Sequence, residues 1–410
     1  MLRAHQSSRN LTLLWGGQLI SQAGSSISHI AVIWLMLELT GSSTLTGLVA
    51  FAGTAPALVF GLFAGVIVDQ FNRQRVMLVG DGFRTLLVLL IPLAYFLGGL
   101  TPGLLAVLVF LLATFGTLFN PARDALIPEF IPAERLFNVN ALVQSTGYLA
   151  YFAGLFGAGM IMGAVGLINL FFVDAMTFAF SFLMVALMRL PTRRPAIGGE
   201  STLKRHRTEL KRGLTYIFRE DRRLSWILII TALNNFFIMG PAIVGTPLLI
   251  REVWQGSGED FAFIESTYGI GMLLGTLLVY RFASHYRKGT WLMLGLIYDG
   301  LTFIPLFWVA SLGMSPFWAT ILIIFIHSIG IPFIQVTRTT LIHSIVPGKM
   351  QGRVFSMINL AVSGVTSLSV AVTGIAAEWL SAKTIFLIIG IGAALTGVIG
   401  LLNPSIRSAD

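Results

Sequence analysis

Cysteine is absent from this chain of 410 residues, and charged residues are scarce. Without cysteine the protein can form neither a disulfide framework nor a thiolate metal site. Asp, Glu, Lys and Arg together make up 11% of the residues, whereas a soluble domain carries about a quarter. A soluble fold with so few charges would have too little polar surface to face water. We therefore expect lipid to be the solvent for most of the chain.

Hydrophobic residues make up 55% of the chain, which also holds 31 Phe and 43 Gly. Glycine is typical of packed membrane helices because it lets their backbones approach closely. Apolar runs of about 20 residues predict membrane spans, and the sequence contains twelve of them. Their approximate limits are 12–37, 46–68, 76–97, 104–122, 138–162, 166–189, 224–250, 261–283, 290–311, 315–337, 354–377 and 382–402. The first span is read as a retained helix, because no small-residue cleavage site follows it.

The Lys and Arg residues predict the orientation of these spans, because cytoplasmic loops of membrane proteins collect them. With twelve spans, both termini and every second loop lie on one side of the membrane. That side, with the helix ends nearest to it, holds 25 of the 27 Lys and Arg residues, and Arg251 and Lys383 fall opposite. We therefore expect a multi-pass protein of the cytoplasmic membrane with both termini in the cytoplasm. The net charge of +9 then indicates the inner membrane surface rather than nucleic acid as its partner.

One polar segment, residues 191–223, separates two blocks of six spans, residues 1–190 and 224–410. The apolar residues of this segment that follow a helical spacing are Leu210, Leu214, Ile217 and Phe218. Among many basic residues, this spacing predicts an amphipathic helix on the cytoplasmic face, attracted to anionic lipid headgroups. The alternative is a solvated linker whose pattern is incidental.

The two blocks repeat one another. RDALIPEFIP (123–132) follows the fourth span and RTTLIHSIVP (338–347) follows the tenth, and the two share a register at an offset of 215 residues. A weaker echo links Asp81-Gly82 in the third span to Asp299-Gly300 in the ninth. The sequence thus predicts an all-α membrane protein with twelve transmembrane helices in two parallel six-helix repeats. Such repeats are typical of transporters in which two bundles rock about a midplane site.

The stretch GVIVDQFNRQR (65–75), after the second span, resembles the signature loop of the major facilitator superfamily, Gly-x-Leu-x-Asp-Arg-x-Gly-Arg-Arg. Gly65, Asp69, Arg73 and Arg75 match that loop, whereas Gln70 stands where a base is usual. WGGQLIS (15–21), NPARDALIPEFIPAERL (120–136) and VPGKMQGRVFS (346–356) are similar to the efflux branch that contains macrolide exporters and enterobactin-type siderophore exporters. The resemblance covers nearly the whole chain.

Three departures from this branch concern proton coupling. Gly24 is followed by Ser25, where many relatives have an acidic residue, and the fourth span lacks a mid-membrane arginine. In GLFGAG (154–159), Leu155 stands where the antiporter motif has proline. These departures leave proton coupling open or place it on other residues.

The resemblance implies that the first, fourth, seventh and tenth spans line a central cavity. In the first span, a stripe on one helical face consists of Gln18, Gln22, Ser25 and His29. An unpartnered amide in lipid costs roughly 1–3 kcal/mol, so we expect the stripe to face a cavity or another helix. The other expected cavity residues are Thr117, Asn234, Asn235, His327 and Gln335. The alternative is that these side chains only join helix to helix by hydrogen bonds.

Carboxylates inside the spans are candidates for proton coupling, because an ionised one at the bilayer centre costs roughly 2.5–3.5 kcal/mol. Asp174 and Asp299 have no sequence neighbour that could neutralise them, and we expect either to carry a proton. The alternative role for both is structural hydrogen bonding. His29 and His327 are further candidates, since imidazole titrates near neutrality.

Charged residues near the cytoplasmic ends of the spans are expected to form a gate. They are Asp69, Arg73, Arg75, Asp81, Arg84, Arg123 and Arg338. Asp69 near a helix N-terminus would be stabilised by the helix dipole, in a contact that can break as the bundles rock. Asp81 and Arg84, three residues apart, are expected to pair and to support this loop. For Arg123 and Arg338 the alternatives are pairing across the inner mouth, binding lipid phosphate, or plain positive-inside anchoring.

These features predict a secondary transporter that exports amphipathic small molecules, either drug- or macrolide-like compounds or siderophores, in exchange for protons. We expect a monomer that needs no metal or other cofactor. The alternative within transport is an importer or facilitator of a nutrient or lipid-like solute. An enzyme or an ATP-driven pump is not indicated, because HExxH, GxSxG and Walker lysine motifs are missing. A receptor or scaffold would need a soluble domain, which the sequence does not predict.

Overall fold

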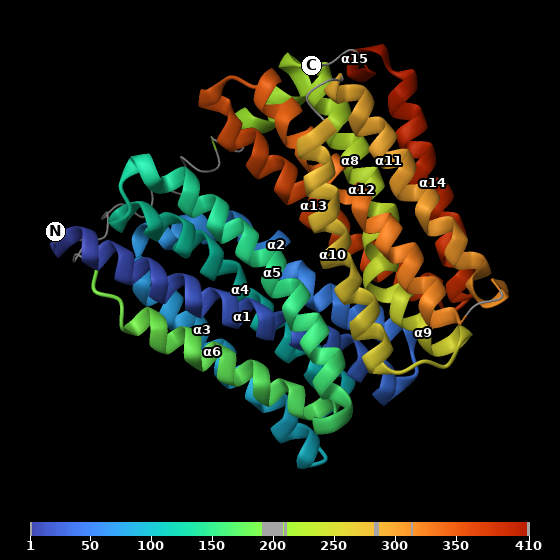
Figure 1. Ribbon diagram of the computed structural model, residues 1–410, viewed down its shortest axis with the longest axis horizontal. Coiled ribbons are helices and arrows are strands. Elements are labelled where there is room, and N and C mark those ends of the chain that lie inside the picture. The colour runs from blue at the N-terminus through green and yellow to red at the C-terminus, as the bar shows by residue number, and fades with distance from the viewer. Residues whose placement is uncertain (1, 191–207, 209–210, 283–286, 313–314, 408–410) are drawn as a thin grey trace. The chain divides into compact units, whose positions relative to one another are not determined.

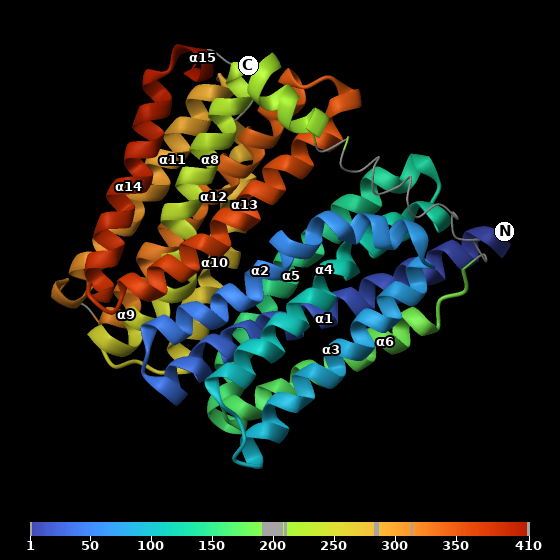
Figure 2. The ribbon, with the colours of Figure 1, turned by 180° about the vertical axis from the view of Figure 1, so that it is seen from behind.

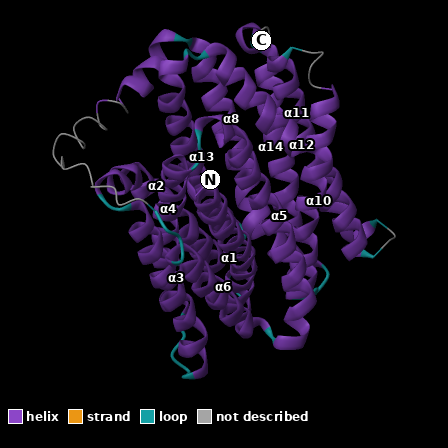
Figure 3. Cartoon of the chain, turned by 60° about the vertical axis from the view of Figure 1, so that its left-hand side comes forward, coloured by secondary structure: helices purple, strands orange, loops and turns teal. Residues whose placement is uncertain are grey.

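The computed structural model describes residues 2–190, 208, 211–282, 287–312 and 315–407, and the regular structure in these ranges is entirely helical (Figure 3). In this part of the chain, twelve helical segments are long and apolar enough to cross a membrane. The prediction of twelve spans is therefore confirmed. Each of these helices satisfies its backbone polar groups internally, as a membrane span requires.

Two compact units divide the chain: residues 1–41 with 52–203, and residues 42–51 with 204–410. The helices of the first part of the chain are α1 (Leu2–Thr40), α2 (Ser43–Gln70), α3 (Arg73–Phe96), α4 (Pro102–Phe130), α5 (Ala133–Val165) and α6 (Leu170–Ala186). The transmembrane helices of the second part are α8 (Arg222–Gly240), α9 (Thr246–Val253), α10 (Gly258–Phe282), α11 (Lys288–Phe303), α12 (Pro316–Ile345), α13 (Gly348–Ala376) and α14 (Ala382–Leu402). A short helix, α15 (Pro404–Arg407), follows them.

Each unit packs its helices in the same pattern. In the first unit α1 lies against α5 and α6, and α3 lies against α4 and α6 (Figure 1). In the second unit α8 lies against α13 and α14, and α11 lies against α12 and α14 (Figure 2). These four pairs correspond one to one when the six spans of each half are numbered in order, and the second unit has in addition a close α10–α12 pair. The repeated packing agrees with two six-helix repeats, as the repeated motif predicted.

Helix ends follow local sequence signals. The turn predicted at LGGLTPG (97–103) separates α3 from α4, and Gly98 adopts a φ of +70° there, which favours glycine. Thr101 caps α4 by accepting a hydrogen bond from the Leu104 backbone at 3.2 Å, and Pro102 occupies the first helical position. Asn72 caps α3 in the same way, accepting from the Arg75 backbone at 3.0 Å.

The fourth and tenth helices run further than predicted. Residues 104–122 and 315–337 marked only the apolar part of these helices, whereas α4 continues to Phe130 and α12 to Ile345. The repeated motifs at 123–132 and 338–347 are therefore mostly helical rather than loops. Hydropathy reports the length immersed in lipid, but a helix satisfies its own backbone and can continue beyond the bilayer.

Proline interrupts the seventh span. Pro241–Gly245 forms a single π-helical turn between α8 and α9, because proline has no N–H to donate to the preceding turn. The ninth span has a comparable break, where α11 continues into the 3₁₀ segment Ile304–Ser311. Both breaks stay within the span, so the predicted spans keep their number.

The polar segment at 191–223 is described only from its C-terminal third, and residues 191–207 and 209–210, including Leu210, lie outside the described residues. In the described part, Tyr216–Glu220 forms a π-helical turn in which Ile217 is fully buried. Leu214 and Phe218 are 46% and 52% exposed. Of the predicted apolar face, Ile217 is therefore buried, whereas Leu214 and Phe218 are exposed.

Candidate functional site

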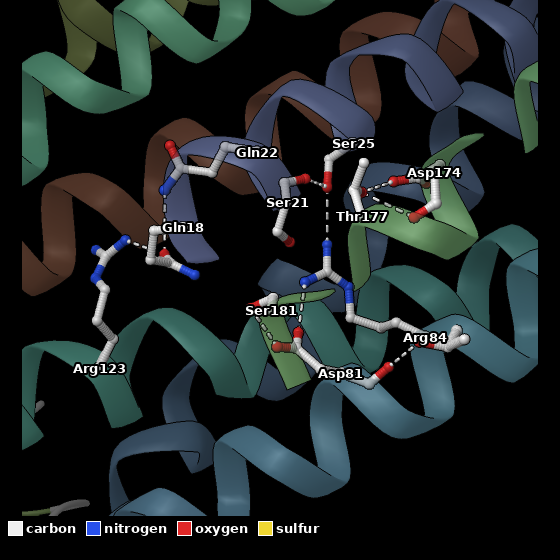
Figure 4. Close-up of polar contacts among 11 residues, drawn as sticks. Gln18, Ser21, Gln22, Ser25, Asp81, Arg84, Arg123, Asp174, Thr177 and Ser181 are labelled. Carbon is white, nitrogen blue, oxygen red and sulfur yellow. Dashed lines mark hydrogen bonds and ion pairs between the residues drawn. The ribbon is translucent and has the colours of Figure 1, made fainter. Parts of the chain in front are cut away.

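A buried cluster of charged side chains joins α1, α3 and α6 in the first unit (Figure 4). Asp81 and Arg84 come from α3 and Asp174 comes from α6, and both carboxylates are completely buried. The Arg84 Nη1 lies 3.6 Å from Asp81 Oδ1. Asp174 belongs to the same group of side chains (Figure 4), and the guanidinium lies over the Phe178 ring at 3.9 Å from the centroid. We call Ser25, Asp81, Arg84 and Asp174 the Arg84 cluster.

Hydroxyl groups hold the two carboxylates of the Arg84 cluster. Ser28 of α1 donates to Asp174 Oδ2 at 2.5 Å, and Thr177 lies 3.2 Å from Asp174 Oδ1. Ser181 donates to Asp81 Oδ2 at 2.6 Å. Among the described residues, Asp81 Oδ1 and Arg84 Nε have no hydrogen-bond partner. The guanidinium therefore forms only a loose ion pair with Asp81.

The charges of the Arg84 cluster do not cancel. Two carboxylates share one guanidinium, so the cluster carries one negative charge when both acids are ionised. A net charge in a lipid-embedded bundle is unfavourable, and one proton on either acid removes it. Arg84 Nη2 donates to Ser25 Oγ on α1 at 3.1 Å, which links the cluster to the polar stripe of that helix.

The predicted stripe of α1 meets α4 and a cleft toward α5. Arg123 Nη1 of α4 donates to Gln18 Oε1 at 3.0 Å, and Gln22 Nε2 donates to the same oxygen at 3.2 Å. Trp15 Nε1 donates to Thr146 Oγ1 of α5 at 2.6 Å. The residues that line the cleft are Leu11, Leu14, Trp15, Gln18, Gln22, Val143 and Thr146. Two amides and an indole thus face a partly apolar space.

The remaining predicted cavity residues of the first unit lie apart from this cleft. His29 is exposed, two turns beyond Gln22 on α1. Thr117 is half-buried and donates to the Ala113 carbonyl of its own helix at 2.9 Å. Neither side chain touches the Arg84 cluster in the contacts that the structure describes.

The second unit has a buried acid on α11, Asp299. Asn234 Nδ2 of α8 donates to Asp299 Oδ2 at 3.2 Å, and His327 Nε2 of α12 lies 3.5 Å from Asp299 Oδ1. His327 Nδ1 lies 2.9 Å from Thr302 Oγ1. Asp299 and His327 are 3% and 1% exposed. Sequence spacing does not predict that these residues meet, since they lie on three helices.

The other predicted residues of the second unit are spread over several contacts. Asn235 donates to Thr366 Oγ1 of α13 at 2.6 Å and so joins two helices. Gln335 and Arg338 are half-buried on α12, one turn apart. Arg338 therefore lies in the C-terminal part of α12, beyond the predicted span 315–337.

The predicted gate residues are distributed over the first unit. Arg73 Nη1 contacts Glu129 Oε1 of α4 at 2.8 Å and the Ala125 carbonyl at 2.5 Å. Arg75 is exposed, and Asp69 lies in α2 with its side chain outside the described residues. Arg123 also pairs with its neighbour Asp124 at 2.8 Å.

Sequence reasoning missed several members of these clusters. They are Ser28, Glu129, Thr177, Ser181 and Thr302. Asp174, Thr177 and Ser181 follow a helical spacing of three and four residues, so a polar stripe on the sixth span was available as a signal. Among the described residues, no group of three or more His, Asp or Glu side chains could hold a metal ion.

Known proteins resemble this chain over almost its full length. Macrolide efflux protein A of Streptococcus pyogenes is 24% identical over 398 residues, which cover 97% of this chain and 96% of that protein. Multidrug efflux pump Tap of Mycolicibacterium fortuitum is 26% identical over 417 residues, covering 98% and 97%. The predicted likeness to the macrolide-exporter branch is thus confirmed.

Solved transporter structures share the fold. A POT family transporter in complex with 5-aminolevulinic acid matches with a TM-score of 0.77 at 14% identity, over 96% of each chain. The nucleoside transporter NupG matches with a TM-score of 0.74 at 12% identity, over 97% of this chain and 98% of that one.

The family model described as transmembrane secretion effector matches residues 4–410. Its members are membrane transporters rather than enzymes. The twelve helices, the doubled packing pattern and this match together identify the chain as a member of the transmembrane secretion effector family of the major facilitator superfamily.

Proposed function

We propose that this protein is a secondary exporter of amphipathic small molecules, macrolide-like drugs or siderophores, across the cytoplasmic membrane. It works by alternating access and is driven by protons moving inward. The observation that carries the proposal is the full-length match to two proteins named for macrolide and multidrug efflux. Because the match covers 97% and 98% of this chain, it includes both repeats.

The cleft beside α1 has a volume of about 10 Å³, room for about one water molecule, so on this proposal it widens to admit an amphipathic compound. Gln18 and Gln22 offer amide donors and acceptors, while Trp15 and the neighbouring leucines offer apolar contact. Sites for small molecules combine a mostly apolar lining with a few placed polar groups. Thr117 and His29, on α4 and α1 of the same unit, are further polar residues that this proposal assigns to the substrate pathway.

The Arg84 cluster supplies a proton site for coupling, with Asp174 as its proton carrier. When Asp174 is ionised, Arg84 is attracted by both carboxylates. A proton on Asp174 leaves Arg84 to Asp81 alone and removes the net charge. Arg84 also donates a hydrogen bond to Ser25 of α1, one turn from Gln22. Protonation of Asp174 therefore alters a contact of the same helix that carries Gln22. A proton and a substrate that bias the same helix can exclude one another, as antiport requires.

The charged cytoplasmic residues complete the proposed cycle. Asp69, Arg73 and Arg75 form a gate that opens and closes as the repeats rock, and Arg338 binds lipid phosphate. Both termini lie in the cytoplasm, and the protein acts as a monomer. Exposed Leu214 and Phe218, beside exposed Lys211, Arg212 and Arg219, support contact of this segment with anionic headgroups.

The alternative within transport is an importer or facilitator of a nutrient or lipid-like solute. It shares the fold and the polar stripe, and it differs in the direction of flux. Inside-out vesicles separate the two, because an exporter fills them with substrate when their interior is acidified.

The decisive experiment measures erythromycin accumulation by an efflux-deficient host that expresses the protein. We expect expressing cells to accumulate several-fold less drug, and a protonophore to abolish the difference. Asp174→Asn should remove the response to the proton gradient, and Asp69→Asn should slow efflux through loss of the gate.

Glu134→Gln, which alters an exposed carboxyl group at the start of α5, is the matched control and should export normally. Extrusion that persists after the gradient has collapsed would contradict proton antiport. Normal pH-dependent export by the Asp174→Asn variant would remove Asp174 from the mechanism.

A further inference from the structure

The hydrogen bonds around His327 bear on which ring nitrogen carries its proton. The Thr302 hydroxyl lies 2.9 Å from the Tyr298 carbonyl and 3.0 Å from the Asp299 carbonyl, either of which can accept its one hydrogen. In that arrangement Thr302 Oγ1 accepts from His327 Nδ1, which lies 2.9 Å away. A neutral His327 then has its N–H at Nδ1 and a bare lone pair at Nε2.

That lone pair is directed at a carboxylate oxygen. His327 Nε2 and Asp299 Oδ1 are 3.5 Å apart, and two acceptors in a dry interior repel one another. The other oxygen, Asp299 Oδ2, already accepts from Asn234 Nδ2 at 3.2 Å. One proton between Oδ1 and Nε2 turns the repulsion into a hydrogen bond, whichever of the two atoms carries it.

Among the described residues, the ion pair recorded for Asp299 is the one with His327, and the other groups nearby are as follows. From α10, Tyr268 meets the His327 ring edge-on at 5.8 Å between centroids, and Glu265 lies one turn earlier on that helix. Tyr298 precedes Asp299 on α11. The α8 helix contributes Asn234, and α14 contributes only Lys383 at its first turn, close to the Phe307 ring. Phe303 packs on His327 at 4.1 Å between centroids.

We infer that Asp299 and His327 form a proton-binding site of the second unit, holding one proton between Oδ1 and Nε2. The Arg84 cluster of the first unit binds its own proton, so each repeat carries one site. On the proposed function, on which this last step rests, the exporter exchanges the proton of Asp299 and His327 in addition to the proton of the Arg84 cluster.

Proton release from the purified full-length protein tests the site without any transport substrate. The protein in weakly buffered detergent is moved from about pH 5.5 to about pH 8.5, a range in which exposed carboxyl groups do not titrate. A pH-indicator dye counts the protons released. Asp299→Asn should release one proton fewer per molecule than the unaltered protein. Glu378→Gln, at an exposed carboxyl group of the same unit, should release the same number.

An equal count for Asp299→Asn and the unaltered protein would overturn the inference. In vesicles loaded with erythromycin, the number of protons exchanged per drug should fall by one in the Asp299→Asn variant. An unchanged ratio would overturn the exchange of the second proton. If Asp299→Asn releases as many protons as the unaltered protein but efflux is still driven by protons, the inference fails and the proposed function stands. If Asp299→Asn releases one proton fewer but efflux does not depend on protons, the binding site stands and the proposed function fails.

Thr302 provides a second route if Asp299→Asn does not give a monodisperse protein. Thr302→Val removes the acceptor at Nδ1, so His327 can place its N–H at Nε2 and donate to ionised Asp299. The site then binds its proton more weakly, and release moves to lower pH. Thr302→Ser keeps the acceptor and should restore the original midpoint. Identical midpoints for the valine and serine variants would contradict the assigned tautomer.

Discussion

A carboxylate buried among membrane helices persists only where partners compensate its charge. Asp81 has a loose ion pair with Arg84, and three hydroxyl groups contact Asp81 and Asp174 in the same cluster. Asp299 instead has one amide and an imidazole. Each arrangement is one proton short of neutrality, which distinguishes these acids from Glu129, whose charge is balanced by Arg73 at 2.8 Å.

Asp221, just before α8 and outside the membrane span, shows the opposite behaviour. It accepts from the Arg223 backbone at 2.9 Å and receives the Arg223 guanidinium on both carboxylate oxygens. Partial burial opposes its ionisation, but the hydrogen bonds and the charge of Arg223 outweigh that effect, so the pKa of Asp221 is lowered. A lowered folded pKa means that the ionised form stabilises the fold.

We expect Asp221→Ala to lower the thermal unfolding temperature at neutral pH, by the equivalent of about 1 kcal/mol for a lost helix cap. The contribution of ionised Asp221 to the free energy of unfolding is fully present above the unfolded pKa of about 3.9. It is lost as the pH falls through the lower folded value. The difference between the two proteins should therefore shrink in acid.

Thermal scans of the detergent-solubilised protein at neutral and acidic pH measure this difference. Glu220→Ala, at the exposed neighbouring carboxyl group, is the control and should show little change. A deficit of the same size at both pH values would mean that the charge of Asp221 contributes nothing.

At the scale of helices, close packing depends on glycine at particular positions. A Cβ at Gly154 of α5 would strike the backbone of Ala23 on α1, including its carbonyl oxygen. A Cβ at Gly157, three residues later, would meet nothing within 4 Å. Within GLFGAG, therefore, the α1–α5 contact requires glycine at position 154 but not at position 157. In the second unit, Gly47 at the start of α2 plays a similar part against Gly374 of α13, with 2.7 Å from a Cβ to the Gly374 Cα.

We expect Gly154→Ala to destabilise the protein by roughly 1–3 kcal/mol, because backbone atoms cannot move aside as a flexible side chain can. Gly157→Ala should be neutral or slightly stabilising, since alanine favours the helix. Thermal unfolding in detergent compares the two variants directly. Equal unfolding temperatures would contradict the tight contact between α1 and α5.

At the scale of the whole molecule, orientation follows from the distribution of Lys and Arg. The native chain has no cysteine, so single cysteines can report topology without background. We expect a membrane-impermeant maleimide to label the Gly99→Cys variant in intact cells, because the turn between α3 and α4 faces outward. The Ser8→Cys and Ser405→Cys variants should be labelled only after permeabilisation.

These substitutions lie at exposed positions or in open turns, and erythromycin export by each variant shows that it is correctly folded. Labelling of either terminus in intact cells would reverse the proposed orientation. It would also remove the gate from the cytoplasmic side.

The sequence by itself determined the number of spans, the doubling and the family. Lipid requires a continuous apolar run for every crossing. The repeat of the Arg123 motif at Arg338 can be recognised in the sequence without knowledge of any tertiary contact. The turn at 97–103 could likewise be predicted from local sequence, since Gly98 and Pro102 restrict or permit particular backbone angles at their own positions. Helix limits beyond the bilayer escaped prediction, because hydropathy reports only the immersed length.

Only the tertiary structure decided the partners of the buried acids. Ser28 reaches Asp174 across 146 residues, and Asn234 reaches Asp299 across 65. Such contacts depend on the rotation and depth at which each helix packs. Many choices of rotation and depth bury the same apolar area, so the hydrophobic pattern does not select among them. Asp174 therefore looked isolated in the sequence, while the packing of α1, α3 and α6 placed it beside Arg84.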